Sequence, residues 1–503
     1  MKDSDRRRSS YREKSGIVSG GGLGHPVIFL IAASTGSTAR NKAFGIRLPL
    51  LGYPAISLAM IASLTPDPYT IRLIDEAHEP VPYGQDCRLA LIVGLTHHMP
   101  NVYHIADRLR SEGTKVILGG FHVTALPDEA LEHADSAILG EAETVWEVVL
   151  NDFSKGGLKK KYIGRAADLA HLPDMRRDLL NRKFYHPGEI IETSRGCAVG
   201  CTFCVVQNFF GRRYRGRSPE AIRTELMAVF GPRPPQTKWK SWLAEHWHPD
   251  IPYFIERRLL YVMDSNFVSD FSHARAVLQV FKDCDIRWYG HASFNLTRDD
   301  SMLDLMAESG CIGVNIGFES LSQKTIDSMR KFPNRTAEYA DSIRRLHDRD
   351  IGVMGTFIVG FDEETPAVFD RIAEFAIENR LETAFTLILT PLPGTPLYDQ
   401  MESQGRIFSR NWSDYDHGSV TFFPHKMTPE QLHWGMRSAW RKIYAWRGIW
   451  KRIMEKPRVR PFFYLPVNIG FLRCTRLICS EKLWPPPEAG KAHIPVKENK
   501  GHA

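Results

Sequence analysis

The chain has 503 residues, of which 43% are apolar and 24% charged. This composition is typical of a globular protein of about three domains and excludes a disordered or fibrous chain. A net charge of +7 is too small at this length to indicate a nucleic-acid partner, and no run of 18 apolar residues occurs that would span a membrane. Residues 1–24 are basic but lack the apolar core of a secretory signal, so we expect a disordered tail.

Residues 25–155 alternate short apolar strands with helices. We expect strands at 26–32, 69–75, 89–95, 115–119 and 136–139, and helices at 54–64, 101–112, 127–134 and 142–153. Short apolar strands separated by helices indicate a parallel sheet that is covered on both faces. The pattern predicts a doubly wound, flavodoxin-like α/β domain over 25–155 and a linker at 156–186.

A second strand–helix series predicts a partial (β/α)6 barrel over 187–398. The expected strands are 189–193, 259–265, 286–292, 311–317, 351–359 and 383–389, with helices near 218–229, 270–283, 299–309, 336–349 and 365–379, and an insertion at 231–257. Such barrels carry their function at the C-terminal ends of the strands. Residues 399–503 lose the alternation, and we expect a helical, basic and aromatic C-terminal region with a disordered tail after 484.

Three of the eight cysteines form a cluster with the spacing C-x3-C-x2-C. Cys197, Cys201 and Cys204 directly follow the first predicted strand of the barrel. Three thiolates from one loop can hold three irons of a four-iron cluster and leave the fourth iron open, whereas a structural zinc site needs a fourth ligand nearby. Because the other cysteines are scattered, the pattern does not indicate a secreted disulfide framework and favours a reducing cytoplasm.

This triplet, with Phe203 before its last cysteine, resembles the signature of the radical S-adenosylmethionine (SAM) superfamily, and the resemblance covers about 188–395. It implies a [4Fe–4S] cluster whose open iron binds SAM, and a low-potential electron donor, flavodoxin or ferredoxin, that drives cleavage of SAM to a 5′-deoxyadenosyl radical. The positions that correspond to SAM contacts are Phe203, Asp264, Asn266, Glu319, Gly355 and Gly360. The alternatives are that Glu319 caps a helix and that the two glycines are packing positions. The arginines that follow the loop, Arg212, Arg213, Arg215 and Arg217, suit either a bound carboxylate or a structural loop.

The first domain resembles the cobalamin-binding domain that precedes many radical SAM barrels. The resembling pieces are 52–59, 94–96, 119–122 and 140–143, all at strand ends or at the helix starts that follow them, where ligands of open α/β sheets bind. The resemblance implies cobalamin contacts at Thr96, Gly119, Gly120, His122, Gly140 and Glu141. The D-x-H-x-x-G motif that supplies a cobalt-ligating histidine is absent, so we expect no histidine ligand from that motif. A domain that kept the fold and lost cobalamin is the alternative.

These features together predict a cobalamin-dependent radical SAM enzyme. We expect a C-methyltransferase that acts on an unactivated carbon of a lipid, pigment or secondary-metabolite substrate, with no acid or base among its catalytic residues because radical abstraction needs none. The alternatives are a cyclase or ring-rearranging enzyme that resembles the oxygen-independent protoporphyrin ester cyclase, and a non-catalytic cobalamin or iron–sulfur sensor.

The C-terminal region leaves a second question open. Nine Lys or Arg residues lie within 437–460, interleaved with tryptophans. Such a segment either caps the barrel with its charges in solvent or rests on an anionic membrane surface. The protein is therefore expected in the cytoplasm, either free or peripheral at the inner membrane.

Overall fold

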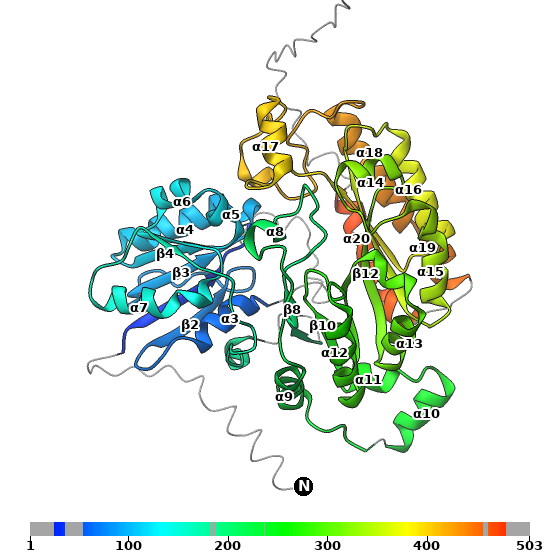
Figure 1. The fold of residues 1–503 in the computed structure, drawn as a ribbon, viewed down its shortest axis with the longest axis horizontal. Helices are drawn as coiled ribbons and strands as arrows, with labels where there is room; N and C mark the ends of the chain where they lie inside the picture. Colours follow the sequence, from blue (N-terminus) through cyan, green and yellow to red (C-terminus); the bar gives the residue numbers. More distant parts are fainter. Residues whose placement is uncertain are drawn as a thin grey trace, which may run out of the picture.

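The computed structural model describes residues 25–35, 54–181, 185, 188–235, 237–455 and 461–478. The tails expected at 1–24 and after 484 lie outside the described residues, as do Gly52 and Tyr53 of the cobalamin-domain resemblance. The described chain forms two large sheets, each with its own helices, and the two units lie side by side (Figure 1).

The first sheet is parallel throughout, with the strand order β2-β1-β3-β4-β5-β6. Its strands are β1 (Val27–Ala32), β2 (Thr70–Asp75), β3 (Leu89–Val93), β4 (Lys115–Gly119), β5 (Ser136–Leu139) and β6 (Lys161–Ile163). The chain winds in both directions from β1 and β3, which confirms the predicted flavodoxin-like fold. The sequence did not predict β6, which lies within the expected linker 156–186. Only Tyr162 of its three residues is buried, so this short edge strand leaves no periodic signal.

Helices cover both faces of the first sheet. They are α3 (Ile56–Ser63), α4 (Met99–Ser111), α5 (Phe121–Ala125), α6 (Pro127–His133) and α7 (Trp146–Ser154), with 3-10 turns η1 (Thr96–His98) and η2 (Ala142–Thr144). One buried cluster contains Ile105 and Ala130 of α4 and α6. The other contains Leu58 and Trp146 of α3 and α7. The strands are therefore buried on both sides, as their continuous apolar sequences predict.

The second sheet is the predicted partial barrel, with six parallel strands in the order β14-β13-β12-β11-β10-β7. They are β7 (Glu189–Ile191), β10 (Leu259–Val262), β11 (Arg287–Ala292), β12 (Cys311–Glu319), β13 (Gly352–Val359) and β14 (Thr383–Ile388). The connecting helices are α9 (Pro219–Phe230), α12 (Phe271–Asp283), α13 (Asp300–Glu308), α14 (Gln323–Ser328), α15 (Tyr339–His347) and α16 (Ala367–Glu378), with shorter turns η3 (Arg177–Leu179), η5 (Phe294–Arg298) and η6 (Thr336–Glu338). Val314, Ile316 and Phe318 of β12 point outward into the main buried core. The alternate positions Asn315 and Gly317 face inward and are only half-buried.

The C-terminal region closes this open barrel. It contains α17 (Pro396–Ser403), η7 (Trp412–Asp414), α18 (Pro429–Tyr444), α19 (Trp446–Ile449), a π-helical turn η8 (Trp450–Met454) and α20 (Pro461–Ile478). On the edge strand β14, the Trp440 indole N–H donates to the carbonyl of Thr386 at 2.7 Å, and the Tyr444 hydroxyl donates to the carbonyl of Ala384 at 3.0 Å. These bonds satisfy strand groups that would otherwise be exposed at the edge.

Helix α20 packs against the N-terminal end of the strands. The Tyr464 hydroxyl donates to the carbonyl of Ile312 at 2.9 Å, and a Cβ on Gly313 or Gly352 would overlap the Tyr464 side chain. The predicted insertion, with α10 (Lys238–His246) and α11 (Ile251–Ile255), meets the start of α20. The C-terminal region therefore packs on the barrel, as one of the two alternatives describes, but Arg437 and Arg452 of its basic residues are buried rather than in solvent. Among the described residues, every helix is either too short or too polar to traverse a bilayer.

Candidate functional site

The cysteine loop begins where β7 ends. A two-stranded antiparallel pair, β8 (Ser194–Arg195) with β9 (Arg215–Gly216), closes the base of the loop. Gly196 has a φ of +87°, and a Cβ there would overlap the carbonyl oxygen of Arg213. A left-handed backbone in so crowded a place requires glycine, so the sequence SRGC at this point fixes the shape of the loop.

Asp264, a predicted SAM contact, anchors the base of this loop. Its carboxylate accepts hydrogen bonds from the backbone N–H and the hydroxyl of both Thr193 and Ser194, at 2.5–3.1 Å. Burial raises the pKa of Asp264, and the four hydrogen bonds oppose that shift. These four hydrogen bonds all come from the loop base, so the structure gives Asp264 a positioning role.

The loop crosses the C-terminal ends of the barrel strands. The Thr202 N–H donates to the carbonyl of Met329, after β12, at 3.1 Å, and the Thr202 carbonyl accepts from the N–H of Leu397, after β14, at 3.0 Å. The Asn266 amide, after β10, lies 3.9 Å from the Cys197 thiol. The Phe203 ring meets Phe361 at 6.4 Å between centroids. Four segments that are far apart in the sequence thus meet at one edge, as the barrel prediction requires.

The thiol donors fit a cluster with one open iron. The loop supplies three cysteine thiolates, which are soft ligands, and each can bind a different iron of the cluster. The donor set therefore suits a [4Fe–4S] cluster through Cys197, Cys201 and Cys204.

A buried ion pair lies beside the cysteines. Lys331 donates to Glu319 across a site where both side chains are almost fully buried. Burial disfavours the Lys331 ammonium, but the charge of Glu319 and of the nearby Cys201 thiol holds its pKa above the usual value. Glu319 has a φ of +62°, and a Cβ on Gly317 would overlap both partners. The sequence analysis predicted Glu319 as a SAM contact, which stays a prediction. It did not single out Lys331, because nothing local marks a lysine twelve residues beyond a strand as buried.

The C-terminal edge of the first sheet is built from glycine-rich turns. Gly120 has a φ of +108°, and a Cβ there would have only the Gly94 carbonyl within 4 Å, at 3.7 Å. Thr124 links two of these turns, since its hydroxyl donates to the Gly120 carbonyl at 2.8 Å and accepts from the Gly140 N–H at 2.9 Å. Leu95, next to Thr96, is 53% exposed at this edge. Open backbone beside an exposed apolar side chain fits a bulky ring such as a corrin.

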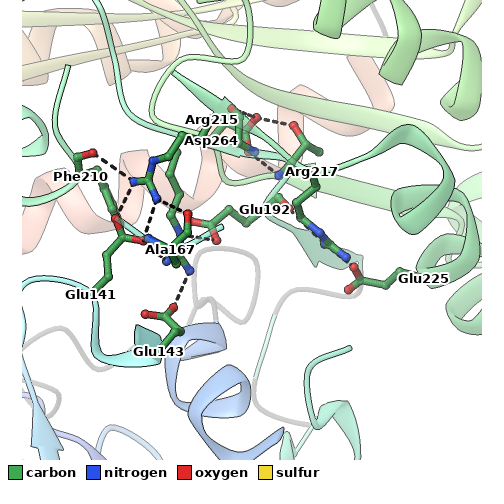
Figure 2. Close-up of polar contacts among 12 residues, drawn as sticks. Glu141, Glu143, Ala167, Glu192, Phe210, Arg215, Arg217, Glu225 and Asp264 are labelled. Atoms are coloured by element: carbon green, nitrogen blue, oxygen red, sulfur yellow. Dashed lines mark hydrogen bonds and ion pairs between the residues drawn. The ribbon is translucent and has the colours of Figure 1, made fainter. Parts of the chain in front are cut away.

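Buried ion pairs join this edge to the cysteine loop (Figure 2). Glu141 follows β5 and is 2% exposed. Its carboxylate accepts from Arg195 at 2.7 Å, from Arg215 at 2.5 and 3.1 Å, and from the Ala167 N–H at 3.2 Å. Arg195 lies two residues before the first cluster cysteine and also pairs with Glu143 at 2.7 Å. The C-terminal edges of the two sheets are therefore fastened to each other through the loop that carries the thiols.

Comparison with known proteins identifies the family. A profile described as the radical SAM superfamily matches residues 273–376. The bacteriochlorophyllide d C-12(1)-methyltransferase of Chlorobaculum tepidum is 30% identical over 437 residues, which cover 85% of this chain and 90% of that protein. The structure of the radical SAM methyltransferase TsrM from Kitasatospora setae, solved with cobalamin and a [4Fe–4S] cluster, superposes with a TM-score of 0.64 at 14% identity, covering 90% of this chain and 99% of that one. The chain belongs to the radical SAM superfamily. The anaerobic magnesium-protoporphyrin IX monomethyl ester cyclase of Cereibacter sphaeroides is also similar, at 23% identity over 71% of this chain and 61% of that protein.

Several predicted contacts of this radical SAM enzyme have other roles in the structure. Gly355 points away from the inward face, because a Cβ there would meet Leu381 and Phe318 at 2.8 and 3.2 Å. Gly360 has a φ of +109°, and a Cβ there would lie only 2.9 Å from the Leu432 side chain of α18. Both are packing positions, which was the alternative that the sequence left open.

Other predicted contacts lie within the protein's own polar network. Glu141 is engaged by two arginines, and Arg217 pairs with the buried Glu225, so two of the four arginines after the loop are structural. His122 is 1% exposed, and its Nε2 lies 3.4 Å from Glu129 while its ring packs edge-on against Trp412 at 4.8 Å. The sequence could not indicate the contact of His122 with Trp412, since Trp412 is 290 residues away.

Proposed function

We propose that this chain is a cobalamin-dependent radical SAM C-methyltransferase whose substrate is an apolar small molecule, such as a pigment or lipid. The observation that carries the proposal is the three-cysteine loop at the C-terminal edge of the barrel, which buried arginines fasten to the C-terminal edge of the flavodoxin-like sheet. This arrangement brings a cluster site and a corrin site to one interface. The pigment methyltransferase at 30% identity supports the reaction type.

Each part of the site has a separate task. Cys197, Cys201 and Cys204 hold the cluster, and Phe203, Asn266 and Glu319 line the SAM site beside it. Thr96, Gly119, Gly120 and Gly140 line the corrin site. When bound, the cluster and SAM supply a 5′-deoxyadenosyl radical and cobalamin supplies the methyl group. Asp264 holds the thiol loop at the barrel, and Glu141 holds it at the corrin site.

The domain bounds and the electron donor complete the proposal. The flavodoxin-like domain extends from residue 25 past the expected 155 to the end of β6 at residue 163, because β6 pairs with β5; the barrel extends over 187–398 and the helical C-terminal region over 399–503. A cluster that must be reduced needs a low-potential electron donor, so we propose a flavodoxin or ferredoxin partner in the cytoplasm. No nucleic-acid partner is proposed.

The experiment compares the wild type with Cys201→Ala after anaerobic reconstitution with iron, sulfide and cobalamin. We expect the wild type to bind about four irons and one cobalamin per chain, and to form 5′-deoxyadenosine from SAM under reducing conditions. Cys201→Ala should lose this cleavage, while Cys474→Ala, which removes a thiol outside the loop, should retain it. Cleavage of SAM by Cys201→Ala would overturn the assignment of the cluster.

The second candidate is a cyclase or ring-rearranging enzyme with the same cofactors. It is favoured by the similarity to the magnesium-protoporphyrin ester cyclase. Methyl-labelled SAM separates the two, because only a methyltransferase places the label in the product. Reconstituted protein that forms no 5′-deoxyadenosine would instead indicate a sensor.

A further inference from the structure

Six of the exposed large apolar side chains of this molecule are tryptophans, in two groups. Trp239, Trp242 and Trp247 belong to the insertion, and Trp434, Trp446 and Trp450 belong to the C-terminal region. Tryptophan is mostly buried in folded proteins, so six indoles that are 38–73% exposed point to a surface that is covered in use.

The second group continues into a basic stripe. Within α19 and η8, Trp446 and Trp450 lie four residues apart and are 54% and 49% exposed. Arg447 and Lys451 repeat the same spacing one residue later and are also exposed. Neither cation has an ion-pair partner among the described residues. We call these four side chains the indole–cation face.

The opposite side of the same helical segment is fixed in the protein. Ile449 and Ile453 are buried, and Arg452 donates to the carbonyls of Leu381 and Ile443 at 2.7 and 3.0 Å. Two of the nine basic residues foreseen as a surface cluster are thus interior groups, Arg437 and Arg452. Because the segment is anchored in this way, the indole–cation face cannot rotate inward.

The insertion that carries the first group of tryptophans packs on α20, the helix that follows the indole–cation face in the chain. His248, next to the exposed Trp247, packs on Phe462 at 4.9 Å between ring centroids. Phe462 lies in the first turn of α20, and η8 ends at Met454, shortly before that helix begins. Helices α10 and α19 both lie on the side of the barrel away from the flavodoxin-like domain (Figure 1). A partner on this side leaves the interface between the two sheets free.

We propose that the indole–cation face, together with the tryptophans of α10, docks the protein on the surface of an anionic lipid bilayer. Indole rings partition into the headgroup region of a bilayer, where the ring is apolar and its N–H is hydrated. Arginine and lysine beside them are attracted to anionic headgroups. The charges of the exposed Arg447 and Lys451 therefore match such a surface. The inference stands on this surface alone and does not depend on the proposed function.

The test is flotation of the full-length protein with vesicles of phosphatidylcholine alone or mixed with phosphatidylglycerol. We expect binding to the mixed vesicles, a shift of tryptophan emission to shorter wavelength, and release as salt is raised. Arg447→Gln/Lys451→Gln should weaken binding roughly 30-fold, which corresponds to about 1 kcal/mol for each cation near the surface. Trp446→Ser/Trp450→Ser should weaken binding to the mixed vesicles and reduce the shift of the tryptophan emission.

The matched control is Lys155→Gln/Lys160→Gln, which removes the same charge from two exposed lysines of the flavodoxin-like domain. This control should bind the mixed vesicles as the wild type does. All variants are compared by circular dichroism and by iron content, so that misfolding is recognised. Absence of vesicle binding, or equal loss in the control, would overturn the proposal. Binding of a reduced flavodoxin that depends on Arg447 and Lys451, without vesicle binding, would assign the face to the electron donor instead.

Discussion

A carboxylate buried just beyond the C-terminal ends of β12 and β13 gives a stability prediction with a defined pH dependence. Glu364 is 3% exposed. It accepts hydrogen bonds from the Ser320 hydroxyl at 3.0 Å and from the N–H groups of Gly360 and Phe361 at 2.9 and 3.2 Å. Burial raises its pKa from 4.5 to about 7 despite these bonds. Glu364→Gln removes the charge and keeps the bonds, since the amide oxygen can accept from both N–H groups and the amide NH2 can donate to Ser320.

The magnitude follows from the shift in pKa. A carboxyl whose pKa is raised in the fold costs stability as pH rises from its unfolded value through its folded value. With the pKa near 4.5 unfolded and about 7 folded, this cost is about 1.4 kcal/mol near pH 5.5 and about 3.4 kcal/mol near pH 8.5. The glutamine has no such cost. The stability gained by Glu364→Gln should therefore grow by about 2 kcal/mol between these two pH values.

Urea unfolding followed by tryptophan emission measures this difference at both pH values for the wild type and the variant. The neighbouring Glu363→Gln is the matched control. Glu363 is exposed, and hydrogen bonds and ion pairs with Lys324 and Lys426 lower its pKa to about 2, so its replacement should not stabilise the protein at any pH. A gain from Glu364→Gln that is constant or shrinks as pH rises would refute the reasoning.

Three further predictions concern the loop, the interface and the closing helix. Gly196→Ala should prevent the loop from folding and abolish iron binding, whereas Gly211→Ala, also at positive φ but with open space around it, should lose only about 1 kcal/mol and retain its iron; equal iron contents would contradict this. Glu141→Ala leaves two buried guanidinium groups without their shared carboxylate and should cost about 3–5 kcal/mol in thermal or urea unfolding, against at most about 1 kcal/mol for Asp283→Ala at a surface pair. Tyr464→Phe loses one buried hydrogen bond and should lower the unfolding free energy by about 1 kcal/mol, so an unchanged value would show that α20 is held by its apolar contacts alone.

Local patterns predicted most of the framework. The strands of both sheets appear within a few residues of their expected positions because continuous apolar runs between helices have few other solutions. The spacing of the cysteines could also be recognised in the sequence, since a loop that wraps a cluster must draw its ligands from one short segment. The edge strand β6 was missed because Tyr162 alone carries its burial.

Contacts between distant segments were not predictable in this way. Whether Glu141 faces a corrin or an arginine depends on the placement of one sheet against the other, and the structure gives it Arg195 and Arg215. Asp264 bonds to Ser194 only when two segments 70 residues apart fold together. Lys331 meets Glu319 only when the chain after β12 folds back over the end of that strand.

The sequence by itself thus determined the two parallel sheets, the thiol loop and the chemistry that three cysteines can support. These depend on periodicity and on residues that are close in the chain. Only the tertiary structure decided which charged groups are buried, which partners they have and which tryptophans remain outside. A charge is tolerated in the interior only when its counter-charge arrives from another segment, and that pairing is a property of the packed molecule.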